Sequence, residues 1–193
     1  ACGVSVILVA IAHLQLFTHV HNRCTQVTHL VLGGLALLAN LLEFSEMNET
    51  GYELSYSRFN VLHMLDELTA AFMPAIHQKN LNIELDYMEA DALVEADDAR
   101  VRQVVSNILT NSIKYSPDHT DIKISAWVTD LLFTITIQDN RIGINESDKQ
   151  ELFTLFFRVD NESNRSVAGT GLGLISSKQI IELHGGELTL QSE

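Results

Sequence analysis

Residues 169–174 read Gly-Thr-Gly-Leu-Gly-Leu, and they open an amphipathic run from Leu172 to Leu183 that stops at Gly185-Gly186. Glycines placed directly before a helix allow backbone N–H groups to approach a phosphate, because no Cβ stands in the way. The positive end of the helix dipole then faces the anion. Taken alone, this pattern fits a phosphate site and an ordinary loop before a helix equally well. The choice between these two interpretations depends on three segments further upstream.

The first upstream segment is an asparagine-rich helix that ends before Pro117. One face is apolar and contains Val101, Val104, Val105, Ile108 and Leu109. Asn107, Asn111 and Lys114 fall on another stripe, at spacings i, i+4 and i+7. An asparagine carbonyl oxygen is a hard, neutral ligand for Mg²⁺, and a lysine ammonium meets phosphate oxygens as a point charge. A solvated polar face would look the same in an isolated helix.

The second segment is Gln-Asp-Asn-Arg-Ile-Gly-Ile at residues 138–144, which follows a β-rich run of strand length at residues 131–137. A carboxylate at the end of a strand, here that of Asp139, can accept hydrogen bonds from the amino group of a purine. An ordinary turn after a strand is the alternative.

The third segment is Leu-Phe-Thr-Leu-Phe-Phe-Arg-Val-Asp at residues 152–160. Aromatic side chains in such a run usually belong to a core. Arg158, directly after them, can reach a phosphate from a loop.

In this order and spacing, the four segments resemble the N, G1, F and G2 boxes of the ATP-binding domain of sensor histidine kinases. The wider GHKL superfamily, which includes gyrase, Hsp90 and MutL, shares the Bergerat ATP-binding fold. Residues 111–117 and 180–186 favour the kinase branch, and the resemblance covers about residues 40–193. It implies an α/β (α+β) two-layer sandwich, with helices on one face of a largely antiparallel sheet, preceded by an α-helical dimerisation hairpin.

The resemblance also implies ATP and Mg²⁺ as ligands and assigns the site position by position. The implied nucleotide-binding residues are Asn107, Asn111, Lys114, Tyr115, Asp139, Gly143, Ile144, Arg158, Gly169, Thr170, Gly171, Leu172, Gly173 and Leu174. Asn111 is the implied Mg²⁺ ligand and Asp139 the residue that reads adenine. Lys114 and Arg158 are implied to hold phosphates, and the glycines at residues 169–173 to close over the triphosphate.

One position departs from the family pattern. The G1 box reads Asp-x-Gly-x-Gly in the family, and Arg141 stands where its first glycine belongs. If that position needs a positive φ, an arginine costs about 1 kcal/mol or more in backbone strain. Arg141 could also obstruct the adenine side of the pocket, point outward or contribute a phosphate contact, and the sequence does not choose among these.

The amino-acid composition restricts the classes of protein to which the chain can belong. The 193 residues are 46% apolar, which supports a buried core in one domain with an extension. A formal charge of −13 argues against nucleic acid and anionic membrane surfaces as partners, although local cations can still bind ATP. Cys2 and Cys24 have neither CxxC nor zinc spacing, which favours a reducing compartment. The expected location is the cytoplasm, either free or as the cytoplasmic part of a membrane-bound sensor.

The chain is expected to divide into two regions. Residues 1–48 are predicted to be a partial helical dimerisation and phosphotransfer region, through which two chains form a homodimer. Val4–Phe17 is apolar but too short for a membrane span, and residues 18–48 form a second helix with its own apolar stripe. Residues 52–193 are predicted to be the ATP-binding domain without its last strand. Strands are expected near 52–57, 81–88, 92–96, 121–128, 131–138 and 187–191, with helices near 60–79, around Asn107 and after the glycine-rich loop.

The phospho-acceptor motif of the family, His-Glu/Asp-x-Arg-Thr/Asn-Pro, does not occur in the sequence. Only His21, in His-Asn-Arg-Cys-Thr-Gln at residues 21–26, resembles it, and His21 lacks the acidic neighbour that would act as general base. His21 is therefore a weak acceptor candidate, and a surface or bundle-packing histidine is the alternative.

The resemblance implies a protein histidine kinase of two-component signalling. It would transfer the γ-phosphoryl group of ATP to a histidine, and from there to an aspartate of a response regulator receiver domain. Arg141 and the missing acceptor motif favour a degenerate, non-catalytic dimerisation or interaction module. A gyrase/Hsp90-type ATPase is the second alternative, and the segment at residues 152–160 counts against it.

Overall fold

The structure, a computed structural model, describes residues 28, 31, 33–35, 37–49, 52–87, 92–129, 132–140, 143–159 and 169–192. The chain forms two compact units, Ala1–Asn48 and Glu49–Glu193, and each is described by itself. The predicted helix Val4–Phe17, the acceptor candidate His21 and Arg141 lie outside the described residues. The predictions for these three therefore stay predictions.

In the first unit, residues 37–47 are helical. Val31, Leu35, Leu38 and Leu42 are spaced by four, three and four residues, and their exposed fractions lie between 53% and 64%. This spacing places them on one stripe of a helix. No helix in the described part of the chain is both long enough and apolar enough to cross a membrane.

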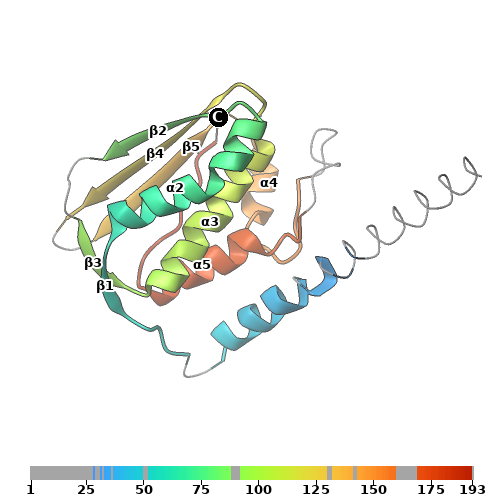
Figure 1. The fold of residues 1–193 in the computed structure, drawn as a ribbon. Helices are drawn as coiled ribbons and strands as arrows, with labels where there is room; N and C mark the ends of the chain where they lie inside the picture. The colour runs from blue at the N-terminus through green and yellow to red at the C-terminus, as the bar shows by residue number, and fades with distance from the viewer. Residues whose placement is uncertain are drawn as a thin grey trace, which may run out of the picture. The chain divides into compact units, whose positions relative to one another are not determined.

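The second unit has two layers (Figure 1). Its elements are β1 (Ser57–Asn60), α2 (Val61–Gln78), β2 (Asn82–Tyr87), β3 (Leu93–Ala96), α3 (Asp98–Tyr115), β4 (Asp121–Val128), β5 (Phe133–Asp139), α4 (Glu146–Glu151) and α5 (Gly173–Leu183). Helices α2, α3 and α5 cover one face of a sheet formed by β2, β4 and β5. The predicted two-layer α/β sandwich is confirmed.

The three-stranded sheet is mixed, and two of the three strand pairings in the described part of the chain are antiparallel, in line with the largely antiparallel sheet expected. β4 is the central strand; β2 pairs with it in parallel and β5 pairs with it antiparallel. The parallel pairing is possible because β3 and α3 lie between β2 and β4 in the chain and carry it back across the sheet. β1 and β3 form a separate antiparallel pair.

The core lies between the helical layer and the sheet. Ile122, Ile124 and Ala126 alternate along β4 and are buried. They belong to the same apolar cluster as Met64 of α2 and Leu109 of α3, both of which are fully buried. Burial of a side chain of this size is worth about 1.5–3 kcal/mol. The cluster therefore holds α3, the helix with the asparagine stripe, against the sheet.

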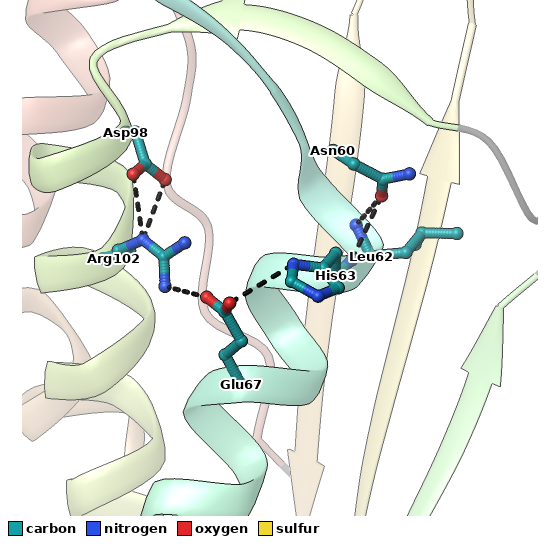
Figure 2. Close-up of polar contacts among 6 residues, drawn as sticks. All are labelled: Asn60, Leu62, His63, Glu67, Asp98 and Arg102. Atoms are coloured by element: carbon teal, nitrogen blue, oxygen red, sulfur yellow. Dashed lines mark hydrogen bonds and ion pairs between the residues drawn. The ribbon is translucent and has the colours of Figure 1, made fainter.

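Polar contacts fix the N-terminal end of α2 (Figure 2). The side-chain oxygen of Asn60 accepts hydrogen bonds from the backbone N–H groups of Leu62 and His63, at 3.0 and 3.1 Å. These two groups have no partner within the helix, so the cap determines where α2 begins.

A charged bridge joins α2 to α3 (Figure 2). Arg102 Nε donates to both carboxylate oxygens of Asp98, at 2.9 and 3.0 Å, and Arg102 Nη1 lies 2.8 Å from Glu67 Oε2. Partial burial lowers the pKa of Arg102, but hydrogen bonds to Asp98 and Glu67 and their charges outweigh this and raise it. Arg102 therefore stays charged and holds the two helices together.

Two secondary-structure predictions need correction, and one helix was not predicted. Residues 187–191 alternate like a strand, but they form no ladder, and Ser192 beside them instead accepts hydrogen bonds from Ile144 N and Lys149 Nζ. The strand predicted at 52–57 lies at 57–60, because only those residues face β3. Helix α4 was not predicted, although Asn145 at its N-cap and acidic residues in its first turn are typical start signals.

Candidate functional site

Helix α3 has the two faces that the sequence predicted. Val104, Val105 and Leu109 are buried on its apolar side. On the polar stripe, Asn107 and Asn111 are half-buried and Lys114 is exposed. The stripe therefore offers two amides and an ammonium, in that order, toward the C-terminal end of the helix.

Asn107 joins α3 to α5. Its Nδ2 donates to the backbone oxygen of Gly173 and to Ser177 Oγ, both at 3.4 Å. A Cβ placed on Gly173 would lie 3.6 Å from Asn107 Cγ, so the glycine lies in van der Waals contact with the amide. Asn107 therefore sets the position of the first turn of α5. Only the hydrogen-bonding capacity that these two contacts leave unused is available to a ligand.

The glycine-rich loop runs along α3 toward its C-terminal end. A Cβ placed on Gly169 would lie 3.8 Å from the hydroxyl oxygen of Tyr115. One end of the loop therefore lies beside Asn107 and the other beside Tyr115, eight residues further along α3. The structure thus brings the predicted N-box and G2-box residues together.

The phenylalanine-rich segment supports the middle of this loop. Gly171 has φ +73°, and a Cβ placed on it would lie 2.7 Å from the backbone carbonyl carbon of Phe156. Phe156 itself has φ +64°, a conformation that a bulky residue adopts only at a cost. Two backbone segments therefore meet at a distance that only glycine permits.

The N-terminus of α5 is suited to an anion. Leu172, at the N-cap position, is fully buried, and among the described residues no side chain caps the helix at this end. The hydroxyl of Thr170 accepts a hydrogen bond from Leu172 N at 3.4 Å, one residue before the helix. The first N–H groups of α5, from Gly173 and Leu174 onward, lack helical acceptors, and phosphate oxygens can accept from such groups.

The opposite end of α5 is anchored by His184. His184 Nε2 accepts a hydrogen bond from the backbone N–H of Asp97 at 3.1 Å, and Nδ1 lies 2.8 Å from the backbone oxygen of Ile180. The geometry assigns the ring proton to Nδ1, because Nε2 must be an acceptor. Asp97 is also the N-cap of α3, so this contact joins the start of α3 to the end of α5.

The remaining predicted residues lie around these elements. Asp139 is the last residue of β5, a strand that packs against α3, and it is half-buried. Gly143 is exposed in the loop after β5, and Ile144 donates its N–H to Ser192 Oγ at 2.8 Å. Arg158 is exposed on the segment after Phe157. These four, like the other predicted site residues, stay predictions as nucleotide ligands.

Two contributors to the site were missed from the sequence. Ser177 is fully buried and accepts a hydrogen bond from the Asn107 amide; the available signal was a pair of serines, Ser176 and Ser177, inside an amphipathic helix. Phe156 supports Gly171 through its backbone rather than its ring, and no residue-type pattern indicates such a contact.

Comparison with known proteins points to the same family. The sequence model of the histidine kinase-, DNA gyrase B- and HSP90-like ATPases matches residues 96–193. The sensor protein GacS of Pseudomonas syringae pv. syringae is 32% identical over 164 residues, which are 82% of this chain and 18% of GacS. The chain thus spans less than a fifth of the length of that relative.

Solved structures are similar as well. The Acinetobacter baumannii histidine kinase AdeS aligns with a TM-score of 0.61 and 27% identity, covering 76% of this chain and 65% of AdeS. The histidine kinase ThkA, solved in complex with the response regulator protein TrrA, aligns with a TM-score of 0.65 and 25% identity, covering 82% of this chain and 43% of ThkA. The family model covers more than half of the 193 residues, and the chain belongs to the histidine kinase-, DNA gyrase B- and HSP90-like ATPases as the ATP-binding catalytic domain of a sensor histidine kinase.

Proposed function

We propose that the chain binds Mg²⁺–ATP between α3 and the glycine-rich loop and presents the γ-phosphate to a histidine. The main support for this proposal is the Asn107–Gly173 contact, which holds the amide face of α3 against the N-terminus of α5. No side chain among the described residues caps that end of α5. Backbone N–H groups at that end suit phosphate oxygens, and the Asn111 carbonyl oxygen suits Mg²⁺. Lys114 and Arg158 balance phosphate charge, and Asp139 reads the adenine amino group.

The transfer needs little covalent chemistry from the protein. The bond between the γ-phosphorus and the β,γ-bridging oxygen breaks as a bond from an imidazole nitrogen to the phosphorus forms, and ADP leaves with the bridging oxygen. This chain contributes to the transfer by orienting the triphosphate and by stabilising its charge. The phosphoryl group then moves to an aspartate of a response regulator, a partner supported by the complex of the related ThkA. Because the reaction consumes ATP, the proposed location is the cytoplasm.

Titration with ATP, with and without Mg²⁺, tests this proposal. The wild-type chain is expected to bind Mg²⁺–ATP, and Asn111→Ala is expected to weaken binding about tenfold in Mg²⁺ but little in EDTA, because only the metal contact is lost. Isothermal titration calorimetry at matched ionic strength gives both values.

Two results would contradict this assignment. Equal weakening of binding in Mg²⁺ and in EDTA would remove Asn111 from the metal site. Failure of the wild-type chain to bind ATP at millimolar concentration would favour the degenerate interaction module instead.

The exposed stripe of the first unit supports a homodimer. Val31, Leu35, Leu38 and Leu42 form a heptad-spaced apolar stripe, and such stripes are covered by a second helix in coiled coils and bundles. We propose that a second copy of residues 1–48 covers it, within a four-helix bundle.

Leu42→Glu is expected to shift the chain toward monomer, because it places a charge in the apolar contact. Asn40→Glu adds the same charge at an exposed position off the stripe and is expected to leave the mass unchanged. Sedimentation equilibrium at micromolar concentration gives the masses. A monomeric wild-type chain, or equal behaviour of the two variants, would contradict the proposed interface.

A further inference from the structure

Lys79 contacts the C-terminal end of α3 from a different element. It is the C-cap residue of α2, and its side chain is half-buried. Lys79 Nζ donates to three backbone carbonyl oxygens: those of Ile113 at 2.9 Å, Lys114 at 2.9 Å and Ser116 at 2.7 Å. An ammonium group has three N–H donors, so all three point at the backbone of this one helix end.

These carbonyl oxygens need an external donor. The last four carbonyls of a helix have no partner within it, and a cation at this end also interacts favourably with the helix dipole. Ser116 N donates back to Ser112 O at 3.0 Å, and Pro117 cannot continue the helix. Lys79 therefore satisfies the Ile113 and Lys114 carbonyls and, through Ser116, fixes the residue at which the chain leaves α3.

The backbone of Lys79 holds the same turn. His119 N donates to Lys79 O at 3.1 Å, and Asn82 N donates to Thr120 O at 3.0 Å. The end of α2 and the turn after α3 are thus joined by side-chain and backbone contacts together. A small movement of this turn would move Lys114 and Tyr115, the last residues of α3.

We propose that Lys79 is a positioning residue of the nucleotide site, one that holds the Lys114 ammonium in place by fixing the backbone of the last turn of α3. This rests on the proposed function, in which Lys114 meets phosphate. Asp139, which reads adenine, lies on β5 and does not depend on this contact. Loss of the Lys79 ammonium therefore weakens recognition of the triphosphate more than recognition of adenosine.

The test compares Lys79→Met, which keeps the length of the side chain without its donors, with Lys79→Arg, which keeps a cationic donor. Lys123→Met is the matched control: it removes the same charge from a lysine that pairs with Glu84 and Asp86 on the sheet. Affinities for Mg²⁺–ATP and for adenosine are measured by NMR titration. Amide hydrogen exchange at residues 114–116 is followed without nucleotide.

Lys79→Met is expected to weaken ATP binding about tenfold and adenosine binding less than about twofold. It is also expected to speed amide exchange at residues 114–116, because the last turn of α3 frays. Lys79→Arg should stay within about threefold of the wild type, and Lys123→Met should match the wild type in every measurement. If Lys79→Met does not fold, Lys79→Gln is judged by the same criteria.

Three outcomes would overturn the proposal: equal losses for ATP and adenosine, unchanged exchange at residues 114–116, or no rescue by arginine. A wild-type chain that binds no ATP would instead refute the proposed function. In that case the exchange measurement still decides whether Lys79 holds the end of α3.

Discussion

Replacing Gly171 with alanine is expected to lower the stability of the domain and to abolish most of its affinity for ATP. The backbone there has φ +73°, which costs an L-residue roughly 1–2 kcal/mol. The new Cβ would also lie 2.7 Å from the carbonyl carbon and 2.8 Å from Cα of Phe156, so one of the two backbone segments must move. Because this loop opens α5, the N–H groups offered to phosphate move with it.

Gly185→Ala is a matched control for Gly171→Ala. Gly185 has φ +76°, and nothing lies within 4 Å of the position of a Cβ there. An alanine at this position therefore has the same cost of a positive φ but makes no close contact. Gly185 also lies at the other end of α5, away from the glycine-rich loop. Urea unfolding is expected to show a larger loss for Gly171→Ala, by about 1–3 kcal/mol, the usual cost of forcing atoms into a packed site. Equal losses in the two variants would show that the Phe156 contact is unimportant.

Asp139→Asn is expected to weaken ATP binding by about ten- to hundred-fold, because it replaces a charged hydrogen-bond acceptor by an amide of the same shape. Loss of a hydrogen bond to a charged group costs about 1.5–3 kcal/mol, which corresponds to this range of affinity. Calorimetric titration with Mg²⁺–ATP gives the change, and unfolding measurements check that the variant stays folded.

Asp86→Asn provides the comparison for Asp139→Asn. Asp86 is a strand carboxylate on β2 whose partner is Lys123, 2.9 Å away. The same chemical change is expected to leave ATP affinity unaltered there. Unchanged affinity in Asp139→Asn would remove Asp139 from the adenine site.

The sequence pattern was sufficient for the elements whose periodicity reports burial. The apolar positions of α3 appear as predicted and β4 lies where a strand was expected, because burial against one neighbouring layer repeats with the period of the helix or strand. The same reasoning failed at residues 187–191, since alternation describes the faces of a strand but not whether a partner strand is present to pair with it.

By itself, the amino-acid sequence determined the family, the two-layer fold and the asparagine stripe, because these depend on residue type and spacing along one element. Only the tertiary structure decided that Asn107 is committed to α5, that Phe156 lies against Gly171 and that Lys79 holds the end of α3. These contacts join residues between 15 and 70 positions apart, and they are made largely to backbone atoms. Backbone groups are the same in every residue, so no pattern of side chains records them.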